Sequence, residues 1–160
     1  LEYFKDAFLI FDLPQFSFSL KKQQKAFKKF YAIDVGLAKN ASFKFSEDRG
    51  RVLENAVFLE LKTRGSSLYY YKTKDGQEVD FFSRENGKNK ELIQVSWSIE
   101  DESVREREIK SLFSAMEELK MKKGRILTFG ESDTIKKSGK EIIVEPVFRW
   151  MLENYLGFIV

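Results

Sequence analysis

The chain has 160 residues, of which 42% are hydrophobic and 15% aromatic, and its formal net charge is +3. This length is enough for one domain with a buried core. The absence of cysteine and histidine excludes disulfides, thiolate chemistry, Ser-His-Asp catalysis and the usual zinc sites. Any metal cofactor would be a hard ion, Mg²⁺ or Mn²⁺, bound by carboxylates, carbonyls and water. The mild positive charge permits nucleic-acid contact without requiring it.

Two features of the chain bear on its location and completeness. No apolar run approaches the roughly 20 residues that a bilayer span needs, and the first residues lack the pattern of a secretory signal. We therefore expect a cytoplasmic protein with no membrane partner. The chain begins with Leu1 rather than methionine, so we expect a fragment of a longer protein.

Residues 1–45 are expected to form a connecting segment with a strand pair and a lysine patch. The first strand ends near Leu13, Pro14 breaks the chain, and the alternation in residues 16–20 predicts the second strand. The patch that follows is a candidate for nucleic-acid binding, although such charge runs are commonly solvated surface. Its members are Lys21, Lys22, Lys25, Lys28 and Lys29.

An amphipathic helix is predicted from Gly50 to Lys62. Its apolar stripe recurs at three- and four-residue spacing, with Glu54 in the middle of the stripe. The stripe consists of Leu53, Val57, Phe58 and Leu61. A carboxylate on a core-facing stripe needs a partner, because an unpaired buried carboxylate is costly. Glu54 is therefore a candidate site residue, with a hydrogen bond to Tyr69, Tyr71 or a backbone amide as the structural alternative.

Three strands are predicted next, at residues 68–72, 77–83 and 91–99. The Asp75-Gly76 and Asn86-Gly87 pairs between them are typical hairpin turns. Side chains alternate between the two faces of a strand. This alternation places every second residue of the second and third strands on one side, beneath the helix. Those predicted to share that side are Glu78, Asp80, Phe82, Gln94 and Ser96, whereas Val79 and Phe81 face the opposite way.

The rest of the chain predicts a helix over residues 105–123, a strand over 125–129, a turn followed by a strand within 135–146, and a closing helix over 147–160. The helix after the third strand is a crossover, which places the strand at 125–129 parallel to the third strand. We therefore predict an α/β fold with a mixed sheet and a helix on each face.

This order of elements, with an acid on the first helix and an aspartate on the second strand, resembles the PD-(D/E)XK phosphodiesterase core. Nearly the whole chain resembles the C-terminal domain of uncharacterised function of bacterial and archaeal AAA-type ATP-binding proteins. The specific motifs are K-x-Y-x-x-D-x-G-L from Lys29, L-E-N around Glu54 and E-V-D-F from Glu78. The resemblance implies a restriction-endonuclease-like core in the order αβββαβ over residues 46–160. It also implies that residues 1–45 lead to an absent ATPase module, the only part that would bind ATP.

The nuclease motif, carried over residue by residue, assigns four positions. Glu54 matches the helix acid, Asp80 the metal-binding aspartate, Gln94 the (D/E) position and Ser96 the lysine position. Glu54 and Asp80 would then be the ligands of Mg²⁺ or Mn²⁺. Gln94 and Ser96 depart from the motif, because a neutral amide replaces an anionic ligand and the cation that stabilises developing charge is lost.

The assignments from the nuclease motif have alternatives. Lys90 and Lys110 are candidates for a displaced lysine, although the sequence offers no support for either. Asp80 also has a purely structural interpretation, in which it pairs with Arg51 or Lys72. Gln94 and Ser96 can likewise be ordinary strand residues.

Three functions remain. The first is a degenerate, non-cleaving accessory domain of an AAA-type ATPase that binds DNA, RNA or a partner protein. The second is a Mg²⁺- or Mn²⁺-dependent nuclease with a variant site. The third is a protein-binding or oligomerisation module, which the 16 phenylalanines favour.

Overall fold

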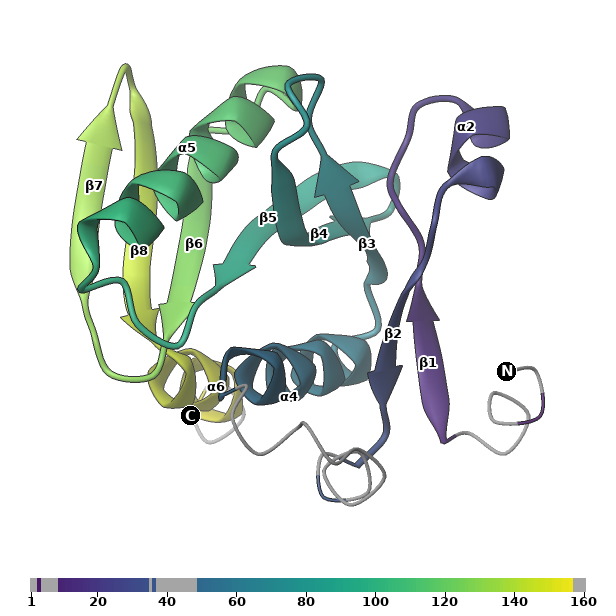
Figure 1. Ribbon diagram of the computed structural model, residues 1–160, viewed down its shortest axis with the longest axis horizontal. Helices are drawn as coiled ribbons and strands as arrows, with labels where there is room; N and C mark the ends of the chain where they lie inside the picture. Colours follow the sequence, from purple (N-terminus) through teal and green to yellow (C-terminus); the bar gives the residue numbers. More distant parts are fainter. Residues whose placement is uncertain (1–2, 4–8, 35, 37–48, 157–160) are drawn as a thin grey trace.

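The computed structural model describes residue 3, residues 9–34, residue 36 and residues 49–156. Three helices and a six-stranded sheet make up the main body (Figure 1). The helices are α4 (Arg49–Thr63), α5 (Glu102–Glu118) and α6 (Val147–Leu156). The strands are β3 (Ser67–Lys72), β4 (Glu78–Glu85), β5 (Lys88–Val95), β6 (Lys123–Thr128), β7 (Asp133–Lys137) and β8 (Lys140–Pro146).

The sheet is mixed, and its strand order is β3-β4-β5-β6-β8-β7. Strands β3 to β5 form an antiparallel meander, and α5 then crosses to β6, which is parallel to β5. The predicted α/β class, the helix, three-strand, helix, strand order and the parallel crossover are therefore confirmed. The Asn86-Gly87 turn is also as predicted, because both residues have positive φ angles of 50° and 75°.

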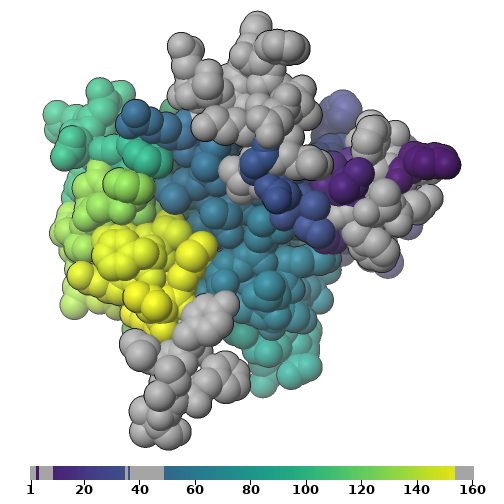
Figure 2. Space-filling model, turned by 90° about the horizontal axis from the view of Figure 1, so that it is seen from below, coloured from purple at the N-terminus to yellow at the C-terminus, as the bar shows by residue number. Residues whose placement is uncertain are grey.

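The helices cover both faces of the sheet (Figure 1). One core lies under α5 and includes Leu112, Met116 and Ile126. The other lies under α4 and α6 and includes Phe58 and Trp150. Figure 2 faces this second side, where yellow α6 adjoins the blue surface that begins with α4.

The N-terminal segment forms a separate two-stranded sheet of β1 (Ile10–Leu13) and β2 (Lys29–Ala32), joined through the short helix α2 (Leu20–Lys25). The prediction that residues 16–20 form the second strand was wrong. Phe16 is buried against Phe82, with ring centroids 4.8 Å apart, but Phe18 stays 79% exposed. The alternation of serine and phenylalanine therefore does not describe one buried face. The antiparallel partner of β1 is β2 instead.

Three further expectations need correction. The third strand ends at Val95 rather than residue 99. The turn predicted within residues 135–146 lies at Ser138 and Gly139, but it is preceded by a further strand, β7, that was not predicted. A register shift in the pairing of β4 with β3 breaks the alternation, so Phe82 packs in the α5 core with Val79 rather than beside Asp80. The last four residues of the predicted closing helix lie outside the described residues.

None of the helices in the described ranges is long and apolar enough to cross a membrane.

Candidate functional site

The candidate site lies where β4 and β5 separate. Their ladder ends at the pair Phe81 and Ile93, and the next residues replace it with side chains. The Val95 amide donates to Asp80 Oδ2 at 3.0 Å, and the Asp80 amide donates to Gln94 Oε1 at 3.3 Å. Asp80 and Gln94, each less than 10% exposed, therefore fill the gap between the strands and satisfy its backbone donors.

Helix α4 brings Glu54 to this gap and also fixes the N-terminal hairpin. The Tyr31 hydroxyl donates to Glu54 Oε1 at 2.7 Å. The neighbouring Asn55 donates to the Ala32 carbonyl and accepts from the Ala32 amide, both at 2.9 Å, so it acts as one further rung on the edge of β2. The L-E-N motif on α4 and the K-x-Y motif on β2 thus contact each other. This contact holds β2 next to Glu54 and Asp80.

Lys29 is the centre of the site. Its ammonium nitrogen lies 2.9 Å from Asp80 Oδ1, 2.9 Å from Glu78 Oε1 and 3.3 Å from Glu54 Oε1. Tyr31, two residues along β2, faces the same way and stacks on Phe58 with a centroid distance of 4.1 Å. A cation supplied by the chain itself therefore lies between the carboxylates that the sequence assigned to a metal.

The electrostatics of the cluster reflect its burial. Burial and the charge of Glu54 raise the pKa of the Asp80 carboxyl to about 7, although the Lys29 ammonium opposes this shift. Burial would lower the pKa of Lys29, but the charges of Asp80 and Glu54 outweigh it and raise that pKa. Burial, followed by the charge of Glu54, raises the pKa of the Tyr31 phenol. Lys29 therefore stays charged and Tyr31 stays a donor at neutral pH.

The arrangement does not suit Mg²⁺ or Mn²⁺ as it stands. Both Asp80 oxygens accept from donors of the chain, and the Glu54 Oε1 atom accepts from both Tyr31 and Lys29. A divalent ion needs these oxygens as ligands and could not share the position with an ammonium group. In the part of the chain that the structure describes, no group of three or more acidic side chains has the arrangement of a metal site.

The structure brings the four positions predicted from the nuclease motif to one pocket, but Ser96 is hydrogen-bonded elsewhere. Glu54, Asp80 and Gln94 line one open pocket of about 520 Å³ together with Ser96. The Ser96 hydroxyl, however, donates to the Ser98 carbonyl at 2.8 Å, so it is engaged in a local turn. Asp80 and Glu54 share Lys29 as a partner, and the Gln94 side chain accepts a hydrogen bond from the Asp80 amide.

The predicted lysine patch divides into two parts. Lys21, Lys22, Lys25 and Lys28 are exposed, and Lys28 pairs with Asp12 at 2.5 Å. Lys29 turns inward to the acids instead. The two lysines considered as displaced substitutes lie elsewhere, because Lys90 pairs with Glu85 at 3.0 Å and Lys110 is exposed on α5.

Sequence reasoning missed Lys29 and Tyr31 as members of the site. It also placed the structural partner of Glu54 on β3, whereas the Tyr71 hydroxyl donates to Glu118 at 2.7 Å. The available signal was the two-residue spacing of K-x-Y, which puts both side chains on one face of a strand. Arg107, exposed at the pocket rim beside buried Glu108, was also not singled out.

Comparison with known proteins adds a family but no activity. A model described as a domain of unknown function, DUF4143, matches residues 49–147. The uncharacterized protein MJ1544 of Methanocaldococcus jannaschii is 42% identical over 162 residues, covering 95% of this chain and 35% of the relative. An uncharacterized protein of Haemophilus influenzae is 33% identical over 100 residues, covering 62% of this chain and 24% of the relative. The chain thus spans about a third and about a quarter of these relatives' lengths.

The raised pKa of Asp80 predicts a pH-dependent difference between wild type and Asp80→Asn. The folded carboxyl has a pKa of about 7 against 3.8 in the unfolded chain, so the folded state binds the proton more tightly. Its contribution to stability is therefore complete below about pH 4 and lost as the pH rises through 7. We expect the free energy of unfolding of wild type, relative to the variant, to fall by a few kcal/mol between these pH values.

Urea denaturation from pH 4 to pH 8 measures this difference directly. Glu100→Gln, at an exposed position, is the matched control and should leave the pH dependence unchanged. A difference that stays constant, or that grows in favour of wild type as the pH rises, would contradict the assigned pKa shift.

Proposed function

We propose, from the premise that this chain belongs to the DUF4143 family of domains of unknown function, that it is a non-cleaving accessory domain of an AAA-type ATPase. In this proposal its core is nuclease-like but degenerate, and it binds a nucleic acid or a partner protein. The relatives' greater length supports the ATPase part, because it leaves room in such proteins for a separate module. The motif resemblance around Glu54 and Asp80 supports the nuclease-like part.

The observation that carries the non-cleaving assignment is the position of Lys29. Metal-dependent nucleases use carboxylates to hold an ion that activates water and neutralises charge on the phosphate. Here the oxygens of Asp80 and Glu54 are hydrogen-bonded to Lys29, Tyr31 and the Val95 amide, at 2.7 to 3.3 Å. The acids therefore serve to anchor β2 and to hold the hairpin on the domain.

Lys29 anchors the hairpin of β1 and β2. The segment that joins these two strands carries three of the most exposed apolar side chains among the described residues. Phe27 is 92% exposed, Phe18 79% and Leu20 75%. They lie in the same segment as the exposed lysines of α2 and Lys28. Aromatic side chains among cations suit stacked bases and phosphates, and an exposed apolar patch also suits a protein interface. This surface is the proposed binding face.

The non-cleaving assignment predicts the response to metal. Wild type should bind no Mn²⁺ at millimolar concentration and should cleave neither DNA nor RNA in Mg²⁺ or Mn²⁺. Lys29→Met removes the cation and leaves three carboxylates close together, so we expect a loss of about 3–5 kcal/mol at neutral pH. Mn²⁺ should bind this variant and restore part of the stability, because it binds the folded state alone. Calorimetric titration and thermal unfolding measure both effects.

Lys28→Met is the matched control, since Lys28 is adjacent but pairs only at the surface with Asp12. It should neither bind Mn²⁺ nor lose comparable stability. The rival function is a metal-dependent nuclease, favoured by the closeness of Glu54 and Asp80 to one cation. Cleavage by wild type that disappears in Asp80→Ala would establish that function and overturn the non-cleaving one.

The binding face predicts a salt-dependent affinity if its ligand is a nucleic acid. Replacing Lys21, Lys22, Lys25 and Lys28 with glutamine should reduce the slope of log K against log salt for single-stranded DNA by about 3. Fluorescence anisotropy at several salt concentrations measures this slope. The charge-matched control changes Lys122, Lys123, Lys136 and Lys137, which are exposed near the β7-β8 hairpin.

Equal losses in the two quadruple variants would show that the α2 surface has no special role. Absence of both DNA and RNA binding in wild type would remove nucleic acid as the ligand. The protein-interface form of the proposal then predicts that Phe18→Ser and Phe27→Ser abolish capture of a separately expressed ATPase module.

A further inference from the structure

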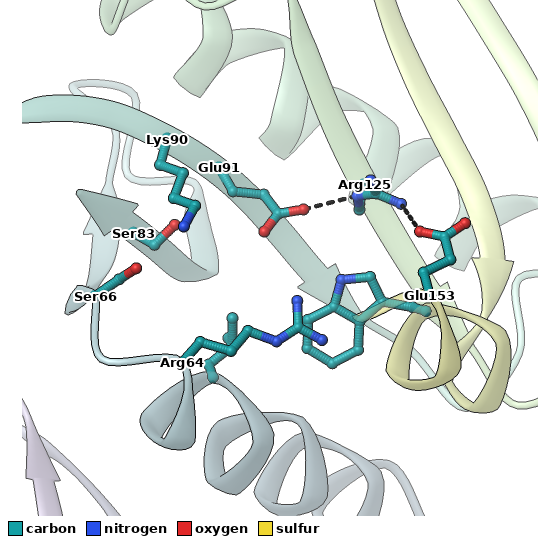
Figure 3. Close-up of a pocket in the computed structure, with 9 residues that line it drawn as sticks. Arg64, Ser66, Ser83, Lys90, Glu91, Arg125 and Glu153 are labelled. Atoms are coloured by element: carbon teal, nitrogen blue, oxygen red, sulfur yellow. Dashed lines mark hydrogen bonds and ion pairs between the residues drawn. The ribbon is translucent and has the colours of Figure 1, made fainter. Parts of the chain in front are cut away.

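A second pocket lies at the opposite end of α4 from the acidic site. It has a volume of about 150 Å³ and lies between the end of α4, α6 and strands β4 to β6 (Figure 3). Arg64 follows Glu54 by ten residues. At a rise of 1.5 Å per residue, this pocket and the acidic site are roughly 15 Å apart along the axis of α4. Gly65, with a φ of +73°, turns the chain here so that Arg64 and Ser66 both line the pocket.

Two buried donors of this pocket lack a partner. Ser83 is 3% exposed, and its hydroxyl has no hydrogen-bond partner among the described residues. The same holds for the buried Nη2 of Arg64, whose Nε donates to Glu60 at 3.2 Å. Buried polar groups are almost always hydrogen-bonded. The neighbours of Ser83 on this face are Phe81 along β4 and Glu91 across on β5, and the Glu91 carboxylate faces Arg125. These two donors therefore call for a ligand that accepts hydrogen bonds.

The charges of the lining favour an anion. Arg64 is held over the ring of Trp150, with the guanidinium carbon 3.7 Å from the ring centroid, so its position is fixed. Lys90 also lines the pocket, and its pair with Glu85 is exposed and therefore weak. The lining acids Glu91 and Glu153 both face Arg125, as Figure 3 shows, at 2.7 and 3.8 Å.

The size and geometry of the pocket narrow the class of anion. Its volume is below the roughly 300–1,000 Å³ of pockets for drug-sized ligands, so it suits one oxyanion group rather than a whole nucleotide. In Figure 3, Ser66, Ser83 and Lys90 lie on one side and Arg64 on the other. Donors on several sides match a tetrahedral group with an acceptor in each direction better than a flat carboxylate.

We propose that this pocket binds a phosphate group, with Arg64 Nη2 and the Ser83 hydroxyl as direct donors and Lys90 as the rim cation. The ligand is either inorganic phosphate or the phosphate of a small monoester whose remainder stays outside the pocket. This site is separate from the acidic cluster and does not depend on the function proposed for it.

Calorimetric titration of the 160-residue chain with inorganic phosphate, at constant ionic strength, tests the site. We expect saturable binding at one site. Ser83→Ala and Arg64→Lys should each weaken it about tenfold or more, because each removes a hydrogen bond to a charged ligand. Arg149→Lys, at an exposed position on α6, is the matched control and should leave it unchanged. No saturable binding, or equal binding by wild type and Ser83→Ala, would overturn the assignment.

Three further measurements keep the test decisive. Without phosphate, Ser83→Ala should have a Tm no lower than wild type, because the hydroxyl has no hydrogen-bond partner to lose among the described residues. A lower Tm would show a structural role and contradict the proposal. Adenosine monophosphate that competes with phosphate would identify a monoester, whereas displacement by phosphate alone would identify the free ion. Acetate that binds as tightly as phosphate would refute the phosphate class.

Discussion

The ion cluster of Lys29 with Asp80, Glu78 and Glu54 is the interaction on which the rest of the site depends. Three carboxylates meet at one end of the β4-β5 pair, and they would repel one another without a cation. The cation comes from β2, far away in sequence. The same contact therefore neutralises the acids and docks the N-terminal hairpin, so a single side chain connects two parts of the chain.

The docking is reinforced by packing on both sides of the cluster. Tyr31 adds a hydrogen bond to Glu54 and a stacked contact with Phe58, and Leu13 of β1 is buried in the same core. Asn55 satisfies both backbone groups of Ala32. Residues of the hairpin therefore belong to the hydrophobic core of the domain. Its exposed end around Phe27 is held in place by these buried contacts.

The sequence allowed a good prediction of what depends on local patterns. The stripe of Val57, Phe58 and Leu61, the hairpin at Asn86-Gly87 and the crossover through α5 all follow from periodicity and turn chemistry. The strand at residues 16–20 and the side of Phe82 could not be predicted in this way. The side of Phe82 depends on a register shift between β3 and β4. The structure of residues 16–20 depends on Phe16 being buried while Phe18 stays exposed.

The sequence pointed to the two acids of the candidate site but not to the residue that pairs with them. An acid on an apolar stripe and another on a strand identified Glu54 and Asp80, because buried charges require partners. The identity of the partner could not be inferred, since Lys29 looked like the end of a surface lysine run. Ser83 and Arg64 gave no signal at all, because the burial of a side chain and the absence of its hydrogen-bond partners become visible only in the folded structure.

A crystal structure of the chain soaked in Mn²⁺, with anomalous diffraction recorded for manganese, tests the central claim most directly. Because Lys29 occupies this position, the map should show no manganese peak between Glu54 and Asp80, and the Lys29 ammonium should lie within hydrogen-bonding distance of both. A manganese ion on these two carboxylates, with Lys29 displaced, would contradict this claim and make the acidic cluster a metal site.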